Sequence, residues 1–378
     1  MPYDVYKKTP IETISEEHIL LDSLGGRLAS KALLDKSTND RFGATIDIAL
    51  ADCLLPIRVL LDAKAADGRS PPPLRGVKAK DGRLFNLLPG GKPEMAAPRI
   101  DVDEREGKLA IEGHARSMRE ARQLMRRVLA KHSLPIELLE KIAKSGEEHI
   151  PDLEISLEYD SNVWRGILKT ACNLLAYQRS DLFLGSGFDA VRKFVLDGDG
   201  HPWDFLAFNT SPIDLALEGR QFGDVDHLVV LNGDCATGDV FGLVVLYGQL
   251  QFTVRLGVGP MVSSFTSAYR VDQLGGRDRL DAHEDASIEV PAYHRYSEAH
   301  YSSWLESQAA AMNRLMPYVM RRAREAAVRS LIEKSLKETF GAPDGTAITE
   351  AQIQDFASRV SERFVAMMFH QGMFHRDD

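Results

Sequence analysis

A histidine beside an acid, with an asparagine further along the chain, is the first feature of this sequence that could do chemistry. Glu17 and His18 are adjacent near the N-terminus, and Asn39 follows after two predicted short elements. A neutral histidine can take a proton from water near pH 7, because its unperturbed pKa is about 6.5. Carboxylate and amide oxygens are the hard ligands that Mg²⁺ prefers. These residue types are suited to metal-assisted hydrolysis of a phosphodiester bond.

Two short strands and a helix are expected to position these residues. The segment 12–21 has the pattern of a strand, Gly25-Gly26 predicts a turn, and a second short strand is expected over 31–34. A helix is expected from Asn39 to about residue 63, with an apolar stripe along one side. Pro56 should kink or divide that helix, because proline lacks a backbone N–H.

The residues of this segment are ordered like the motif of a known nuclease family. They are Glu17-His18-Ile19, Leu24-Gly25-Gly26, Asn39 and Phe42-Gly43. Over residues 3–60 the chain resembles the HNH endonucleases, also called ββα-metal nucleases. The resemblance implies that His18 is the general base and that Glu17 and Asn39 hold a Mg²⁺ or Mn²⁺ ion, which makes Asn39 part of the catalytic set.

Two features of that family are missing from this chain. Many members hold a structural zinc ion with two CxxC pairs, and the matching places here are Tyr3 with Tyr6 and Asp35 with Thr38. We therefore expect no structural zinc, and a core refilled by the two tyrosine rings. The dipeptide Ser30-Lys31 stands where the family's middle asparagine would be, so the usual brace of the histidine is not expected.

Three more residues of the segment are candidate ligands. Asp47, on the expected helix, could add an oxygen to the metal ion, and Arg41 and Arg58 could contact phosphate. A solvated acid or an ion-pair partner is the alternative for Asp47, and a surface role is the alternative for the arginines. The whole segment could also be plain structure, with Thr13 capping a helix and His18 on a surface turn.

The charge of the chain argues against a protein that coats nucleic acid without specificity, because the formal net charge is −9. Residues 64–92 are an exception, with seven basic side chains and two acidic ones. Lys78, Lys80 and Arg83 of this segment are predicted to contact a nucleic-acid backbone. A solvated basic loop is the alternative interpretation.

A second basic surface is expected on a later helix, which Ser117 can cap. Contact with DNA and simple solvation are its two interpretations. Its members are Arg119, Arg122, Arg126 and Arg127.

The length of 378 residues suggests several domains and an α+β fold class. We expect an HNH-like ββα module over 1–66, a basic Pro/Gly-rich linker over 67–98, a mixed α+β domain with antiparallel strands over 99–290 and a helical region over 291–378. The clearest single elements are strands over 227–231, 240–245 and 250–256, a helix that starts at Asp160 or Ser161, and helices over 302–340 and 349–374.

The cellular setting is expected to be cytoplasmic. Cys53, Cys172 and Cys235 lie far apart, so neither a disulfide framework nor a CxxC metal site is expected. No apolar run reaches the roughly 18 to 20 residues that cross a bilayer, and the N-terminus lacks the layout of a secretory signal. We expect no contact with a membrane.

Three functions remain open at this point. The first is a metal-dependent endonuclease that cleaves DNA, working as a homodimer with protein partners in a bacterial defence system. The second is a catalytically silent nucleic-acid-binding or scaffold protein that keeps the HNH-like module. The third is an RNase that uses Arg295 and His300, which have the spacing seen in HEPN-type ribonucleases.

Overall fold

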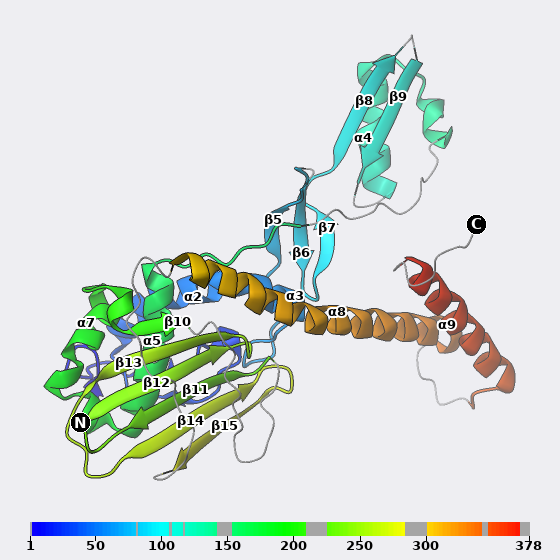
Figure 1. Cartoon of the computed structure of the whole chain (residues 1–378). Helices are drawn as coiled ribbons and strands as arrows, with labels where there is room; N and C mark the ends of the chain where they lie inside the picture. Colours follow the sequence, from blue (N-terminus) through cyan, green and yellow to red (C-terminus); the bar gives the residue numbers. More distant parts are fainter. Residues whose placement is uncertain are drawn as a thin grey trace. The chain divides into compact units, whose positions relative to one another are not determined.

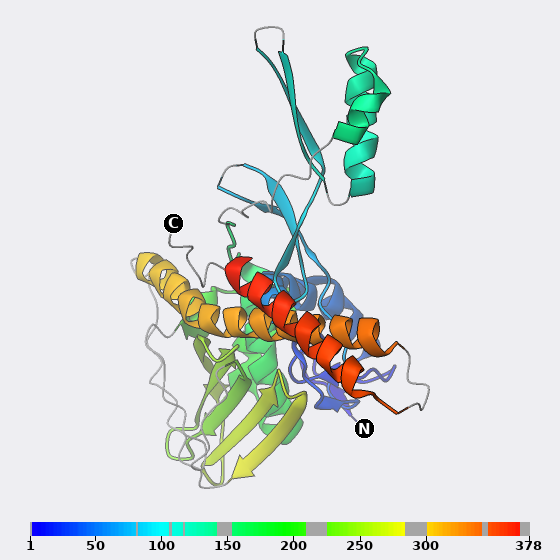
Figure 2. The ribbon, with the colours of Figure 1, turned by 90° about the vertical axis from the view of Figure 1, so that its right-hand side faces the viewer.

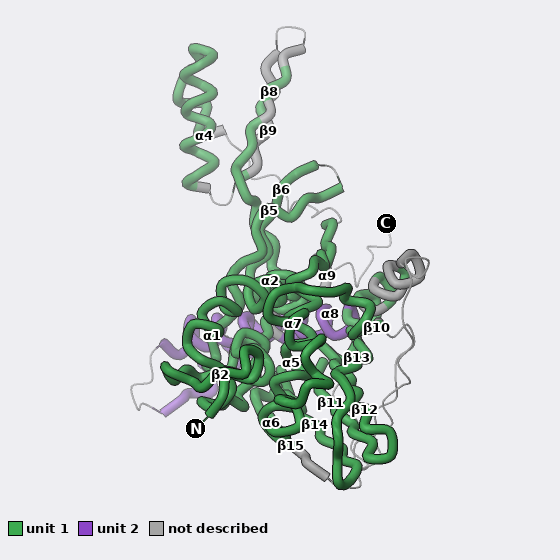
Figure 3. The backbone as a smooth tube through the Cα atoms, turned by 90° about the vertical axis from the view of Figure 1, so that its left-hand side faces the viewer, with its two compact units in different colours: residues 1–315 green, residues 316–378 purple. Residues whose placement is uncertain are grey.

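The computed structural model describes residues 2–80, 82–105, 108–115, 118–141, 153–208, 225–283, 301–341 and 347–370. The chain forms two compact units, residues 1–315 and residues 316–378 (Figure 3). The expected α+β fold is confirmed, because small antiparallel sheets stand beside separate helices. The segments expected to form a module, a linker and a mixed domain all lie within the first unit, and the expected helical region is divided between the two units.

The N-terminal segment contains two short hairpins followed by a helix. In the second hairpin Glu17 pairs with Ser30 and His18 with Ala29. The carboxylate of Asp35 accepts a hydrogen bond from Ser37 N–H and so caps the helix. The predicted order of strand, strand and helix is present, with the second strand slightly earlier than expected. The elements are β1 (Tyr3–Asp4), β2 (Thr9–Pro10), β3 (Glu17–His18), β4 (Ala29–Ser30) and α1 (Lys36–Phe42).

The turn between β3 and β4 depends on two glycines. Gly25 has a φ of 81°, a left-handed conformation that glycine adopts without steric cost. A Cβ atom on Gly26 would lie 2.0 Å from the carbonyl oxygen of Leu20. Side chains at these positions would therefore push the returning strand away from β3.

The single helix expected after Asn39 is divided into several pieces. A π-helical turn covers Gly43–Asp47, and α2 (Ile48–Cys53) and α3 (Leu55–Leu61) follow. Pro56 lies in the first turn of α3, where a missing N–H costs no helical hydrogen bond. The prediction that Pro56 divides the helix is confirmed.

A six-stranded antiparallel sheet, in the order β10-β13-β12-β11-β14-β15, forms the largest part of the core. The three strands expected from the sequence are confirmed as β11, β12 and β13. Figure 1 shows α5 lying across one face of this sheet. The elements are α5 (Ser161–Gln178), α6 (Ser180–Phe183), α7 (Asp189–Asp197), β10 (Leu206–Phe208), β11 (His227–Gly233), β12 (Asp239–Leu246), β13 (Leu250–Val258), β14 (Phe265–Asp272) and β15 (Arg277–His283).

The helix α5 is enclosed on all sides, because the sheet covers one side and α2 with the π-helical turn covers another. Every residue from Val163 to Ala176 is buried. Asp160 caps the helix by accepting a hydrogen bond from Val163 N–H at 2.9 Å, as the sequence predicted. Polar residues inside such a helix must find partners, since an unpaired buried polar group is costly.

Two small sheets and one helix lie between α3 and α5 in the sequence. β8 and β9 pair along their whole length, and α4 packs on β9 (Figure 2). The elements are β5 (Leu74–Lys78), β6 (Leu84–Leu88), β7 (Lys92–Met95), β8 (Arg99–Arg105), β9 (Lys108–His114) and α4 (Met118–Lys131).

The two helices expected near the C-terminus are present as α8 (Tyr301–Phe340) and α9 (Glu350–His370). The rings of Phe340 and Phe356 contact each other, with centroids 5.7 Å apart. Arg363 donates a hydrogen bond to Ser335 Oγ at 3.0 Å. No helix in the described ranges is long and apolar enough to cross a membrane.

Candidate functional site

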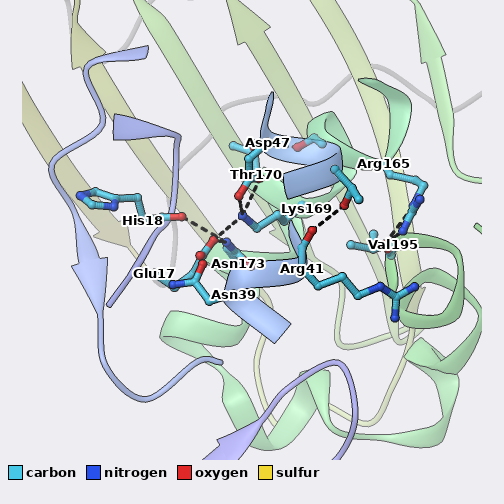
Figure 4. Close-up of polar contacts among 12 residues, drawn as sticks. Glu17, His18, Asn39, Arg41, Asp47, Arg165, Lys169, Thr170, Asn173 and Val195 are labelled. Carbon is cyan, nitrogen blue, oxygen red and sulfur yellow. Dashed lines mark hydrogen bonds and ion pairs between the residues drawn. The ribbon is translucent and has the colours of Figure 1, made fainter. Parts of the chain in front are cut away.

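Four residues predicted to form a site line one pocket, which has a volume of about 300 Å³. Glu17, His18, Asn39 and Asp47 contribute to its wall, and Lys169 of α5 joins them (Figure 4). Its other lining residues are Glu16, Leu21, Asp22, Ser23, Ile48 and Ala51.

Lys169 lies between the two acids that were predicted to hold a metal ion. Its Nζ is 2.6 Å from Glu17 Oε1 and 2.7 and 2.8 Å from the two carboxylate oxygens of Asp47. The side chains of Lys169 and Glu17 are each 3% exposed, and that of Asp47 is 17% exposed. We call these three residues and Asn173 the Lys169 cluster. The cation of this cluster is therefore a side chain of the protein and not a bound metal ion.

Asn173 completes this cluster from one helical turn further along α5. Its Nδ2 donates to Glu17 Oε1 at 2.6 Å and to the carbonyl oxygen of His18 at 3.1 Å. Its Oδ1 accepts a hydrogen bond from the hydroxyl of Tyr6 at 2.8 Å. Lys169 and Asn173 are four residues apart, so both face the N-terminal segment and attach it to α5.

The electrostatics of the cluster favour a charged lysine. Burial alone would lower the pKa of Lys169, but Glu17 and Asp47 raise that pKa above its ordinary value. Burial also raises the pKa of Glu17, and the opposing effect of Lys169 does not cancel this rise. Two carboxylates around one ammonium leave excess negative charge, which a proton on Glu17 would neutralise.

The imidazole of His18 does not join the acids of the cluster. Successive residues of a strand point to opposite faces, and here Glu17 points toward α5. Figure 4 shows the imidazole of His18 directed away from Lys169 and Asn173, while its carbonyl oxygen points toward them. The predicted convergence of His18 and Glu17 on one ion is therefore not the arrangement in the structure.

Asn39 acts as a brace for the loop before β3. Its Nδ2 donates to Ser15 Oγ at 2.6 Å and to the carbonyl oxygen of Glu16 at 2.9 Å. These contacts hold the start of α1 against the strand that carries His18. The predicted role of Asn39 as a metal ligand is untested by these contacts, since they engage the amide nitrogen and not the oxygen.

A divalent ion does not fit the predicted ligand set as the side chains lie. Mg²⁺ needs oxygens at about 2.0 to 2.1 Å in a near-octahedral shell. The facing oxygens of Glu17 and Asp47 are already bound to the ammonium of Lys169, and a second cation there would meet a like charge. Within the described part of the chain, no group of three or more His, Cys, Asp or Glu is arranged to hold a metal ion.

A second charged cluster surrounds Asp4 in the N-terminal segment. Asp4 is fully buried, and its Oδ1 accepts from the N–H groups of Tyr6 at 3.1 Å and Lys7 at 3.0 Å. Its Oδ2 accepts from Asp35 N–H at 3.2 Å and from the hydroxyl of Thr38. We call these five residues the Asp4 cluster. One carboxylate thus connects the chain around Tyr6 with the start of α1.

The prediction that the rings of Tyr3 and Tyr6 fill this part of the core is correct for Tyr6 and wrong for Tyr3. Tyr6 is 4% exposed, and its ring contacts those of Phe42 and Phe183 edge-on at 5.2 and 5.9 Å. Tyr3 is 44% exposed and fills no core space. The alternation along β1 explains the difference, because Tyr3 and the buried Asp4 point to opposite faces.

Arg41 and Arg58, which were predicted to contact phosphate, have different surroundings in the structure. Arg41 pairs with Asp197 at 3.0 Å on the surface. Arg58 is only 6% exposed, in the buried α3, so the prediction that it contacts nucleic acid is wrong. The apolar stripe of the helix was predicted correctly at its start, but the break at Pro56 places Arg58 on an inner face.

The remaining basic candidates lie on or beside the β5–β6 hairpin. Lys78 and Lys80 are exposed and share one face, because the residues between and before them, Ala79 and Val77, are buried. The guanidinium of Arg83 lies 5.5 Å from the ring centre of Phe85. This hairpin therefore presents two lysines to solvent.

Sequence reasoning missed three residues that organise the site: Asp4, Lys169 and Asn173. The signal available for the last two was a lysine and an asparagine one turn apart in a mostly apolar helix. The RNase candidates Arg295 and His300 lie outside the described residues.

No protein-family model matches the chain, and neither curated proteins nor solved structures provide a match.

Proposed function

We propose that this protein is a non-cleaving, HNH-like nucleic-acid-binding protein, the second of the three functions open from the sequence. The observation that carries the proposal is the ammonium of Lys169 between the carboxylates of Glu17 and Asp47. That position is the one where a nuclease of this design would hold its divalent ion.

The energetics support a permanent lysine rather than an exchangeable one. Withdrawing one partner from a buried ion pair costs about 3–5 kcal/mol, because the other charge stays buried and uncompensated. A Mg²⁺ ion would have to supply at least that much and also lose part of its own hydration shell. The ββα segment then serves as a platform attached to α5, with no hydrolytic step.

Binding of nucleic acid is supported by the resemblance of residues 3–60 to a DNA-acting family and by the exposed Lys78 and Lys80. Lysine side chains bind phosphate as point charges and add a salt-dependent contribution to affinity. DNA is the expected partner. A cytoplasmic setting, a homodimer and protein partners in a defence complex belong to the same proposal.

The test combines cleavage and binding on the full-length protein. Plasmid DNA is incubated with Mg²⁺ or Mn²⁺ and with wild type, His18→Ala or Asn39→Ala, and binding to a fluorescent duplex is measured beside it. We expect binding that weakens with salt and no cleavage by any variant. Metal-dependent cleavage that His18→Ala abolishes would overturn the proposal.

The endonuclease remains a second candidate because one observation favours it. Glu17, His18, Asn39 and Asp47, the four residues that the motif and its spacing single out, all line the same pocket. In that case Lys169 must leave the carboxylates before a metal ion binds. Cleavage by wild type that starts only at millimolar Mn²⁺, together with faster cleavage by Lys169→Met, would favour this candidate.

A further inference from the structure

The helix α4 presents a concentrated positive charge on one side. Its apolar side packs on β9, with Leu129 only 3% exposed. The opposite side carries five exposed basic residues, and Glu120 is the helix's only acid. The exposed basic residues are Arg119, Arg122, Arg126, Arg127 and Lys131.

None of these five side chains has an ion pair or hydrogen bond within the described residues. Some exposed cations elsewhere are paired: Lys36 lies 2.7 Å from Asp40, and Arg359 lies 2.8 Å from Asp355. Leaving five cations unpaired on one helix concentrates positive potential there.

The spacing of these residues suits a polyanion with a regular repeat. Arg119, Arg122 and Arg126 follow an i, i+3, i+7 pattern and so lie on one face of the helix. From Arg119 to Lys131 the helix advances by about 18 Å at 1.5 Å per residue, which equals the length of about five base pairs. Arginine also forms paired hydrogen bonds with phosphate, which lysine does not.

A membrane surface is a poorer partner for this helix. A helix that lies on a bilayer inserts its apolar face among the lipids. The apolar face of α4 is already in contact with β9, so only the basic face is free. The free face can contact charged groups but has no apolar side chains to insert.

We propose that the exposed face of α4 binds the phosphate backbone of duplex nucleic acid. This inference rests on the proposed function and adds to it the surface that makes the contact. The surface reads no base sequence by itself, because its contacts are with phosphates. It lies on an element outside the HNH-like segment.

The test measures fluorescence anisotropy of a labelled 20-base-pair DNA or RNA duplex with the full-length protein at 50 and 200 mM salt. The five phosphate contacts of α4 contribute about −4.5 to the slope of log K against log salt, which is a roughly 500-fold loss across this range, and contacts through Lys78 and Lys80 add to it. The triple variant Arg119→Gln, Arg122→Gln, Arg126→Gln should have a slope that is less steep than that of wild type by about 2.7. Its affinity at 50 mM salt should be at least about 10-fold below wild type.

A matched control removes three positive charges that are already paired: Lys36→Gln, Arg69→Gln and Arg359→Gln. This variant has the same net charge as the α4 variant and should keep the affinity and the salt slope of wild type. Equal weakening in both variants would show a general charge effect and overturn the proposal. Unchanged binding in the α4 variant would also overturn it, while leaving nucleic-acid binding itself intact.

Two further outcomes separate this inference from the proposed function. Wild-type protein that binds neither duplex contradicts both proposals. Wild-type protein that cleaves DNA, yet loses affinity through the α4 variant, contradicts the non-cleaving function and supports the surface. Preferred binding of vesicles with anionic lipids, again through these arginines, would overturn the choice of nucleic acid as the partner.

Discussion

The Asp4 cluster and the Lys169 cluster bury charges of opposite sign at the N-terminal segment. Asp4 is a buried anion surrounded by donors, and Lys169 is a buried cation surrounded by acceptors. In both clusters a buried charge is balanced by side chains and backbone groups of the chain itself.

The two clusters differ in what they connect. Asp4 joins residues that are at most 34 positions apart, so it closes the N-terminal segment on itself. Lys169 reaches Asp47 across 122 positions and fixes that segment to α5. Loss of Asp4 should therefore loosen one segment, whereas loss of Lys169 should uncouple two layers of the core.

The largest effect is expected for Lys169→Met, which leaves Glu17 and Asp47 facing each other without a cation. The free energy of unfolding in urea should fall by about 3–5 kcal/mol. Millimolar Mn²⁺ should restore part of the melting temperature of this variant and leave wild type unchanged. Lys193→Met, at an exposed lysine of α7, is the control and should stay within about 0.5 kcal/mol of wild type. An unaffected Lys169→Met protein would refute the role of the cluster.

A smaller loss is expected for Asp4→Asn, which keeps the shape of the side chain but removes its charge. Hydrogen bonds to a charged group contribute about 1.5–3 kcal/mol, and the new amide group would face Asp35 N–H with a donor. We expect a loss of about 2–3 kcal/mol in urea unfolding. The melting temperature of wild type should not respond to a chelator. A drop in melting temperature with chelator would show that a metal ion holds this region.

A modest loss of about 1 kcal/mol is expected for Asn39→Ala, because two hydrogen bonds to the loop before β3 disappear. Urea unfolding measures the loss, and the affinity for a DNA duplex measured beside it should not change. A variant with full stability that loses metal-dependent DNA cleavage would instead establish Asn39 as a catalytic ligand.

The last expected effect, for Asp35→Asn, is a loss of stability that depends on pH. Hydrogen bonds from the N–H groups of Thr13 and Ser37 hold the pKa of Asp35 well below its usual value. A lowered folded-state pKa contributes stability above the unfolded pKa of about 3.9, and this is lost as the pH falls toward the folded value. Between pH 5 and pH 3 the stability of Asp35→Asn should therefore decline less than that of wild type. Asn39→Ala, which keeps Asp35, should show the wild-type pH dependence.

Local elements were the most predictable part of this molecule. The capping of α5 by Asp160, the break at Pro56 and the strands β11, β12 and β13 follow from short-range rules of backbone geometry and side-chain alternation. Arg58 was misplaced because its exposure depends on what packs against α3. That packing is set by residues far away in the chain.

The sequence by itself determined which residues could do chemistry and in what order of strand, strand and helix they occur. Glu17, His18, Asn39 and Asp47 reach one pocket because that order brings them there. Only the tertiary structure decided what the acids bind, since Lys169 and Asn173 arrive from a helix more than a hundred residues further along. The physical reason is the separation of the partners along the chain. Hydrogen bonds within a turn join residues close in sequence, whereas a buried charge is neutralised by whichever distant segment packs against it.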